Sequence, residues 1–276
     1  MAYMKKLIVS AISTWLFLRV GGAGADMTCD PGTMPRPGQF QVGLQGAWTC
    51  SQYFEDVEAR ITRGEESYLV AAKDIKVTDD RSFMVGLAYG VSDRFGVYAE
   101  LGLKDGGTFH FSDWEADGGT WWSNEFDLKS VFAWGLGAKL RVFESREGLG
   151  LVLAARYQRY DDRETGDMEY PGPGVSRNDF KADYWQADVA AVVYQKLGPV
   201  IPYAGLGYEY AELTIAGRAN LGTPYADHID FGAMNSDDGL NAVVGLGWRP
   251  AGGCGVTLQG DFITRTAVAL GVNYAF

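Results

Sequence analysis

The sequence predicts an all-β protein: an antiparallel up-and-down β-barrel that crosses a membrane, most simply with ten strands and otherwise with eight or twelve. Three observations lead to this fold class. Apolar and polar side chains alternate in ten segments, the connections between segments alternate between short and long, and the last segment ends on the aromatic Phe276. An apolar face edged with aromatic residues is what a transmembrane barrel presents to lipid.

The first three segments, residues 39–49, 81–91 and 95–104, have a large apolar side chain at nearly every second position. Leu44 and Gln45 are typical neighbours in this pattern. Successive side chains of a strand point to opposite faces of the sheet. Each segment therefore has one face for lipid and one face for the lumen.

The next three segments are residues 126–142, 149–160 and 181–195. Their apolar positions again fall on one face. The opposite face carries charged residues such as Lys139 and Arg156. Because a buried charge needs a partner, these segments predict ion pairs inside the barrel.

The last four segments are residues 200–213, 240–249, 254–264 and 266–276. Glycine often occupies their predicted lumen-facing positions. Glycine there either leaves room in the lumen or serves the tight curvature of the strands.

The connections between segments alternate in length. Those at 92–94, 144–148, 197–199 and 250–253 are short, and those at 50–80, 105–125, 161–179 and 214–239 are long and rich in Asp, Glu, Gly and Pro. Short periplasmic turns and longer extracellular loops are typical of single-chain outer-membrane barrels. Residues 55–62 and 68–77 in the first long connection either extend a hairpin above the membrane or add strands.

The N-terminal residues 1–25 read as a cleaved signal peptide, with Lys5 and Lys6 before an apolar run and Ala23-Gly24-Ala25 at its end. A helical anchor is the alternative. Residues 26–38 would then be a periplasmic N-terminal segment, and residues 39–276 the barrel. The formal charge of −11 becomes about −14 without the signal peptide, which argues against nucleic acid as a partner.

Nothing in the sequence predicts a cofactor. The three cysteines include no C-x-x-C pair, so we expect no zinc cluster. Cys29 precedes the first segment and Cys254 opens the ninth, so both would lie at the periplasmic end. If a disulfide forms, we expect it to join Cys29 to Cys254.

The end of the chain resembles the C-terminal assembly signal of Gram-negative-type outer-membrane proteins, in which Gly271 is followed by the aromatic residues Tyr274 and Phe276. Residues 89–98 similarly resemble the strand–turn–strand of small outer-membrane β-barrel and porin-like families. The resemblance implies insertion by the barrel-assembly machinery and an outer-membrane location. It carries no functional residues with it.

Charged residues predicted to face the lumen form the first candidate site. They are Glu100, Lys104, Lys129, Lys139, Arg141, Arg156, Asp188, Glu209, Arg249 and Asp261. One interpretation is an ion-pair network that plugs the lumen. The other is a polar path for small solutes.

Aromatic residues near the predicted strand ends form an expected girdle at the membrane interfaces. They are Trp48, Trp134, Tyr157, Trp185, Tyr208, Trp248, Tyr274 and Phe276. Trp114, Trp121 and Trp122 fall in a long loop instead, where they either pack within the loop or bind a surface ligand.

The long acidic loops supply the remaining candidates. Asp227, His228 and Asp230 could form a general base flanked by carboxylates, although solvated loop residues are the simpler interpretation, as for His110. A dense acidic cluster could bind divalent cations that bridge lipopolysaccharide. It comprises Asp161, Asp162, Glu164, Asp167 and Glu169.

These observations favour an outer-membrane barrel with a structural or interaction role, or with narrow passage for small solutes. Its expected partners are lipopolysaccharide, the barrel-assembly machinery and an extracellular ligand at the acidic loops. The alternative function is an outer-membrane enzyme, such as a protease of the omptin type that uses His228. A soluble β-sandwich is disfavoured by the apolar stripe on every segment.

Overall fold

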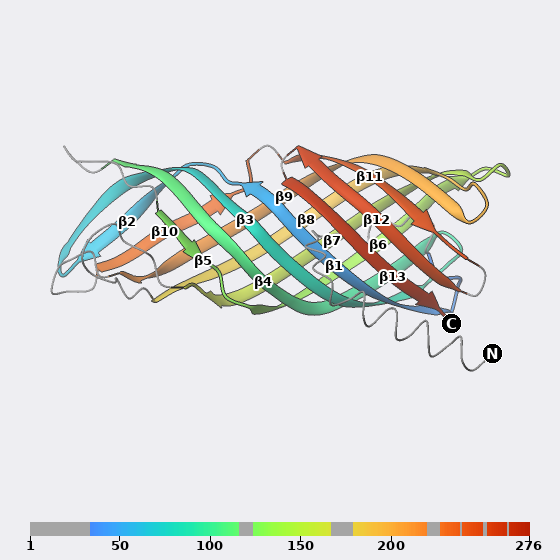
Figure 1. Ribbon diagram of the computed structural model, residues 1–276, viewed down its shortest axis with the longest axis horizontal. Helices are drawn as coiled ribbons and strands as arrows, with labels where there is room; N and C mark the ends of the chain where they lie inside the picture. The colour runs from blue at the N-terminus through green and yellow to red at the C-terminus, as the bar shows by residue number, and fades with distance from the viewer. Residues whose placement is uncertain are drawn as a thin grey trace.

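The computed structural model describes residues 34–115, 124–166, 179–219, 227–237, 239–250, 253–263 and 265–276. These residues form thirteen strands of a single antiparallel sheet (Figure 1). Within the described ranges, no helix is long and apolar enough to cross a membrane. The predicted signal peptide, and residues 26–33 of the N-terminal segment, lie outside these ranges.

The strands follow one another in chain order. They are β1 (Phe40–Tyr53), β2 (Val57–Arg63), β3 (Glu66–Gly90), β4 (Phe95–Glu115), β5 (Asn124–Asp127), β6 (Val131–Glu144), β7 (Leu149–Glu164), β8 (Asp179–Gln195), β9 (Val200–Ala219), β10 (Asp227–Asn235), β11 (Leu240–Trp248), β12 (Cys254–Ile263) and β13 (Arg265–Ala275).

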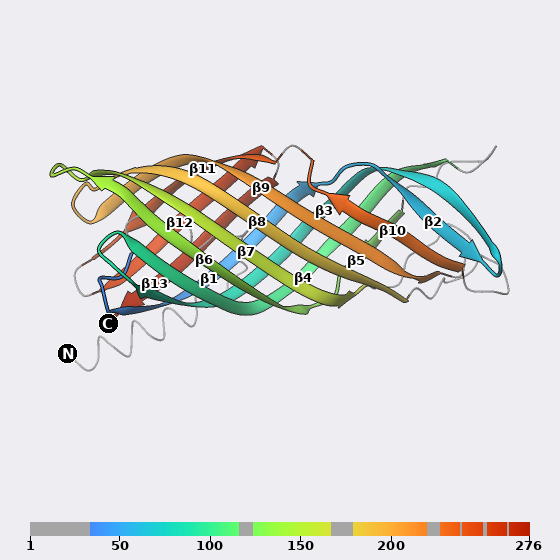
Figure 2. The same cartoon turned by 180° about the vertical axis from the view of Figure 1, so that it is seen from behind.

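Ten of these strands close into a ring. Its order is β1, β3, β4, β6, β7, β8, β9, β11, β12 and β13, and β13 pairs back onto β1 (Figure 2). The register places Leu44 opposite Val272 on β13 and Val85 on β3. This confirms the predicted ten-stranded antiparallel barrel, and closure leaves the ring without a free edge.

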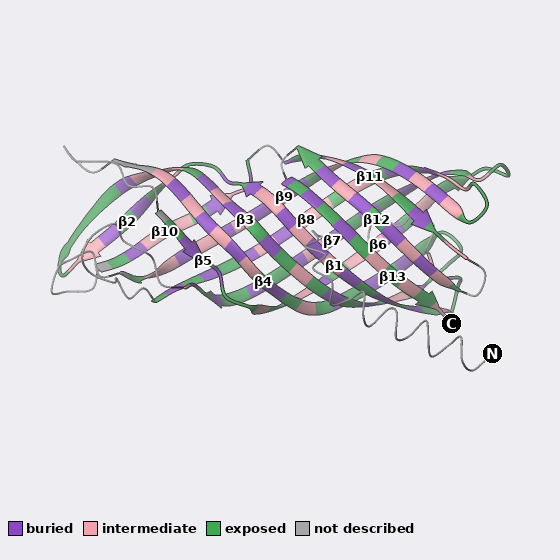
Figure 3. Cartoon of the chain, in the orientation of Figure 1, coloured by how far each residue is buried: buried purple, intermediate pink, exposed green. Residues whose placement is uncertain are grey.

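Buried and exposed residues alternate along the strands of the ring (Figure 3), and large apolar side chains are exposed on every one of its strands. Each of the ten strands exposes a large aliphatic side chain on the outer wall of the ring: Leu44, Leu87, Leu101, Leu136, Leu153, Val193, Leu206, Leu246, Leu258 and Leu270. A continuous apolar belt of this kind needs a lipid environment.

The barrel continues beyond the ring as a narrower extension, at the end away from the short turns. There β2, β5 and β10 join the upper parts of β3, β4, β7, β8 and β9, and a bridge between Leu128 and Thr165 completes the circuit. Residues 50–80, predicted as a long connection, therefore include β2 and half of β3. Residues 126–142, predicted as one segment, are instead divided between β5 and β6.

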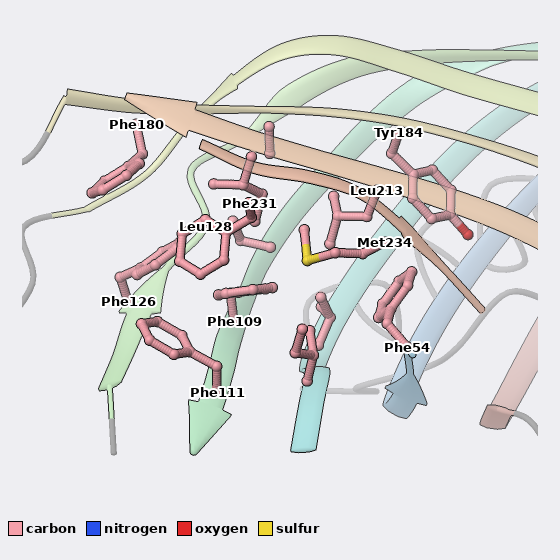
Figure 4. Close-up of a cluster of buried hydrophobic side chains, with 14 of the residues drawn as sticks. Phe54, Phe109, Phe111, Phe126, Leu128, Phe180, Tyr184, Leu213, Phe231 and Met234 are labelled. Atoms are coloured by element: carbon pink, nitrogen blue, oxygen red, sulfur yellow. The ribbon is translucent and has the colours of Figure 1, made fainter. Parts of the chain in front are cut away.

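In the extension the apolar side chains point inward (Figure 4), whereas most of those of the ring point outward. Phe126 stacks on Phe180 with ring centroids 5.6 Å apart and on Phe109 at 4.9 Å. Phe231 packs edge-on against Phe109 and Phe111. An eight-stranded barrel is just wide enough to be filled by its own side chains, and this core fills it.

The short-turn end of the ring is closed by a smaller apolar cluster, which includes Val152, Val192 and Tyr194. The N-terminal segment also packs here. Pro37 bridges to Gly90, and the Gly38 amide donates to the Gly90 carbonyl over 2.8 Å.

Candidate functional site

Between these two apolar clusters, the inward side chains of the ring become polar. Along β8 they run from Val192 in the small cluster, through Asp188 and Gln186, to Tyr184 and Phe180 in the large core. The same order occurs along β9, where Glu209 separates the two apolar groups. The candidate site is this charged layer.

Arg156 on β7 forms the ion pairs in one half of the layer. Its Nε donates to Asp188 Oδ2 over 3.1 Å, and its Nη1 lies 3.5 Å from Glu100 Oε1 on β4. Strand β6 separates β4 from β7, and its inward residues here are Gly135 and Gly137. A Cβ at residue 135 would lie 2.5 Å from Glu100 Oε1, so glycine is what lets the Glu100 side chain cross β6.

Arg265 on β13 forms the ion pairs in the other half. Its Nη2 donates to Asp261 Oδ2 over 2.9 Å, and its Nη1 lies 3.3 Å from Glu209 Oε2. The Gln186 amide joins the halves, because its Nε2 donates to Asp188 over 3.2 Å and its Oε1 lies 3.5 Å from Arg265 Nη1. The charges of this layer thus form one hydrogen-bonded network.

A second group of charges lies at the junction between the ring and the extension. Asp80 accepts from Lys104 Nζ over 3.0 Å and from Arg163 Nη2 over 2.9 Å. Arg163 is fully buried, and its Nε donates to the Lys129 carbonyl over 2.7 Å. Lys104 Nζ also lies 4.8 Å from the centre of the Tyr184 ring. One carboxylate therefore compensates two buried cations.

Local backbone distortions place two of these residues. Asp79 and Asp162 have positive φ angles of 55° and 54°, a conformation that Asp tolerates better than most residues. The register of β7 on β8 shifts between Tyr160 and Arg163. Strict alternation cannot anticipate such shifts, so Asp80 and Arg163 were not among the predicted lumen charges.

Two small cavities lie along the lumen. One cavity of about 20 Å³ is lined by the charged layer, including Asp188, Glu209 and Arg265. Another of about 20 Å³ lies at the short-turn end, where Met34 and Pro35 close it. Each is large enough for about one water molecule.

Most of the predicted lumen charges lie inside: Glu100, Lys104, Lys139, Arg156, Asp188, Glu209 and Asp261. Lys129 differs, because it lies between β5 and β6, is exposed, and pairs with Glu164. Arg141 lies at the short-turn end, 3.5 Å from Glu144, and Arg249 follows the end of β11. Alternation no longer applies at or beyond the ends of strands.

Several members of the network were not predicted. Arg265 fell between the predicted segments 254–264 and 266–276, although it opens β13 and points inward. The other three are uncharged and so were not among the predicted lumen charges: Gln52, Tyr184 and Gln186. Gln52 donates to Glu209 Oε1 over 3.0 Å.

An aromatic ladder crosses the outer wall where the ring meets the extension. Trp134, Tyr157, Trp185 and Tyr210 lie on the four neighbouring strands from β6 to β9, with centroid distances of 5.6, 6.1 and 5.2 Å in sequence. The Trp185 indole donates to Glu212 over 3.2 Å. Tyr210 was not predicted.

The other predicted girdle residues lie elsewhere on the wall. Trp48 donates to Asp79 over 3.0 Å, on the extension side. Tyr274 and Phe276 stack with centroids 6.5 Å apart at the short-turn end, where Trp248 is also exposed. Tyr208 lies two residues before Tyr210 on β9, below the ladder. The wall thus has aromatic residues at both edges of its apolar belt.

The His228 motif lies on β10. His228 is exposed and stands opposite Thr62 and Arg218 in the register, while Asp230 accepts the amide hydrogen of Gly232 over 2.8 Å. The Asp227 side chain lies outside what the structure describes.

His110 belongs to a row of polar side chains on the outer wall of the extension. Its Nε2 lies 2.8 Å from Thr78 Oγ1, and its Nδ1 lies 3.1 Å from Glu125 Oε2. A hydroxyl, an imidazole and a carboxylate therefore follow one another across β3, β4 and β5.

The acidic cluster is partly visible. Asp161 pairs with Arg159, Asp162 with Lys181 and Glu164 with Lys129, while Asp167 and Glu169 lie outside the described ranges. Within those ranges, no group of three or more His, Cys, Asp or Glu side chains is placed to hold a metal ion.

The predicted disulfide cannot be followed, because Cys29 precedes the first described residue. Cys254 opens β12 opposite Tyr274, and its thiol is free among the described residues. Trp121 and Trp122 also lie outside the described ranges.

A closed ten-stranded ring, an apolar outer belt and aromatic edges occur together only where strands cross a lipid bilayer. The fold is that of an outer-membrane β-barrel. Its short turns and its extension lie at opposite ends of the ring. The sequence matches no protein-family model and no curated protein.

Several solved structures of outer-membrane proteins have a similar arrangement of strands. The protein resembles the outer membrane protease OmpT from Escherichia coli (11% identity, 86% of this chain and 97% of that chain, TM-score 0.49). It also resembles the outer membrane protein OprG from Pseudomonas aeruginosa (11% identity, 88% and 97%, TM-score 0.42). A third is Ail, the attachment invasion locus protein of Yersinia pestis (11% identity, 87% and 99%, TM-score 0.30).

Proposed function

We propose that this protein is a non-conducting outer-membrane barrel with a structural or surface-interaction role. The observation that carries this proposal is the filling of the lumen by three successive layers: the apolar cluster at the short-turn end, the charged network and the aromatic core of the extension. A hydrated ion would have to displace all three. Wide water-filled channels need about 16 strands or more.

The extension supports the interaction role. It carries a rigid apolar core beyond the membrane, and its outer wall bears paired charges such as Arg159 with Asp161. An extracellular ligand would meet this wall and the acidic loops above it. During biogenesis, we propose that the barrel-assembly machinery binds the last strand, on which Tyr274 and Phe276 are exposed.

Single-channel recording of the refolded mature chain in a planar bilayer tests the closed lumen, after a heat-modifiable gel shift has verified folding. We expect no steady conductance. Asp188→Asn serves as the matched variant, because it removes a lumen charge without changing the volume of the side chain. Steady currents in the wild type, with cation selectivity that Asp188→Asn alters, would overturn the proposal and favour narrow passage of solutes.

A hydrolase is the second candidate, and the row Thr78–His110–Glu125 is the observation that favours it. In this order the imidazole could accept the hydroxyl proton while the carboxylate orients it. The test is turnover of fluorogenic esters and peptides by the folded barrel. Activity lost in His110→Ala but kept in His228→Ala would establish this row; the reverse would favour the protease alternative at Asp227, His228 and Asp230. If the folded barrel hydrolyses neither the esters nor the peptides, both candidate catalytic sites are excluded.

A further inference from the structure

The small cavity inside the charged layer lies against Asn241 on β11. Its volume is about 20 Å³, and the polar side chains around it include Asp188, Glu209, Asp261 and Gln259. A space of this size holds about one water molecule. The hydrogen-bonding groups that face the cavity decide what can occupy it.

The pairing of three neighbouring strands explains why space remains there. Ala190 on β8 lies opposite Gly207 on β9, and Gly207 lies opposite Asn241. Ala190 and Gly207 each lie two residues from an inward carboxylate, that of Asp188 or Glu209, so they share its face. Since Gly207 has no side chain and Ala190 has only a methyl group, the lumen is left unfilled beside the Asn241 amide.

Two oxygen atoms at this level have no hydrogen-bond donor among the described residues: Asn241 Oδ1 and Glu209 Oε2. Asn241 is 7% exposed and Glu209 is 1% exposed. Arg265 Nη1 lies 3.3 Å from Glu209 Oε2 as an ion pair, but without the geometry of a hydrogen bond. A buried acceptor without a donor destabilises the folded state, so a donor inside the cavity would stabilise the barrel.

The occupant therefore has to be small and has to donate hydrogen bonds. An ionised carboxylate and an amide oxygen only accept them. A cation is less suited to this cavity, because Arg265 lines it and already pairs with Asp261 over 2.9 Å. In the described part of the chain, no three His, Cys, Asp or Glu side chains are placed to hold a metal ion. Water is neutral, carries two hydrogens and has the right volume.

We propose that this cavity binds one resident water molecule, which donates to Asn241 Oδ1 and to Glu209 Oε2. Buried waters typically bond to polar groups that the protein itself leaves unpaired. This water would add Asn241, and with it β11, to the hydrogen-bonded network of the charged layer.

The water site rests on the filled lumen proposed above, because in an open channel this water would exchange freely with solvent. The two proposals fail in different ways. Steady single-channel currents would refute the filled lumen, whereas a dry cavity in a silent barrel would refute only the water site.

The test is nuclear magnetic resonance of the full mature barrel in lipid nanodiscs, deuterated and labelled with ¹³C at the alanine methyl groups. The Ala190 methyl group lines the cavity, so a resident water gives it a through-space cross-peak to the water resonance. Opposite signs in the laboratory-frame and rotating-frame spectra distinguish a bound water from passing solvent. Ala59 is the internal control, because it is fully buried in the large apolar core.

Asn241→Leu removes the amide oxygen and fills the cavity. Gln45→Leu is the matched control. Gln45 is also a buried amide whose Oε1 has no donor among the described residues, but it lies on β1 and lines neither of the two small cavities. A heat-modifiable gel shift verifies that each variant is folded.

We expect the Ala190 cross-peak in the wild type and in Gln45→Leu, and its loss in Asn241→Leu. Asn241→Leu should also have a lower melting temperature than the wild type, because Glu209 loses a donor. A dry cavity predicts an equal or higher melting temperature, since an unpaired buried amide is replaced by an apolar side chain.

Absence of the Ala190 cross-peak in the wild type would overturn the proposal, whether or not the variants fold. Persistence of the cross-peak in Asn241→Leu would also overturn it. Loss of the cross-peak when sodium chloride replaces choline chloride at equal ionic strength would overturn it in favour of a bound sodium ion.

Discussion

The side chain of Glu100 lies directly over Gly135 on the neighbouring strand, with Oε1 2.5 Å from the position that a Cβ there would take. This contact allows a carboxylate on β4 to meet a guanidinium on β7, although β6 lies between them. The charged layer therefore depends on an uncharged residue that forms none of its bonds.

Gly135→Ala should destabilise the barrel for this reason. The added methyl group would displace Glu100 from Arg156, and overpacking of a core typically costs about 1–3 kcal/mol. The measurement is the free energy of unfolding by guanidinium in lipid vesicles, followed by Trp fluorescence. Gly46→Ala is the control, because a Cβ at Gly46 would meet nothing within 4 Å. Equal losses in the two variants would contradict the explanation.

Asp80→Asn should be more damaging than Arg163→Met. The first leaves Lys104 and Arg163 without their shared carboxylate, and breaking a buried pair in this way costs about 3–5 kcal/mol. The second leaves Asp80 with Lys104. A double-mutant cycle on the same unfolding assay measures the coupling between Asp80 and Arg163. Additive effects would mean that their 2.9 Å contact contributes nothing specific.

Trp185→Ala should weaken the aromatic ladder at its centre. It removes stacking on Tyr157 and Tyr210 and the bond to Glu212, and aromatic pairs contribute about 0.5–1.5 kcal/mol each beyond their buried area. Trp185→Phe keeps a ring but no indole N–H, so it separates stacking from hydrogen bonding. If the Phe variant is as unstable as the Ala variant, the bond to Glu212 dominates.

The ion pair of Glu144 with Lys196, at the short-turn end, predicts a pH dependence. Burial by itself would raise the pKa of Glu144, but hydrogen bonds from Lys196 and Tyr194 outweigh it, so the pKa is lowered. A lowered pKa stabilises the folded state above the unfolded value of about 4.3. This contribution is lost as the pH falls through the folded pKa.

Glu144→Gln should therefore be less stable than the wild type at neutral pH, by a small amount because the site is largely exposed to solvent. The difference in unfolding free energy should vanish in acid. Titration of both proteins between pH 7 and pH 3 measures it. A difference that grows as the pH falls would refute the assignment.

Much of the barrel was predictable because the relevant pattern is local. Leu44 and Gln45 point to opposite faces whatever the rest of the chain does, since adjacent side chains of a strand always do. The same reasoning placed Glu100, Arg156 and Asp261 inside. It did not extend to Lys129, which lies between two strands, or to Asp80 and Arg163, which follow residues with positive φ.

The sequence by itself determined the barrel class and the lipid-facing wall, because both follow from short-range alternation, and it favoured ten ring strands over eight or twelve. Only the tertiary structure decided that Arg265 joins Asp261 and Glu209, and that Ala190, Gly207 and Asn241 line one cavity. These contacts depend on the register between strands, which many pairings around a closed ring determine together.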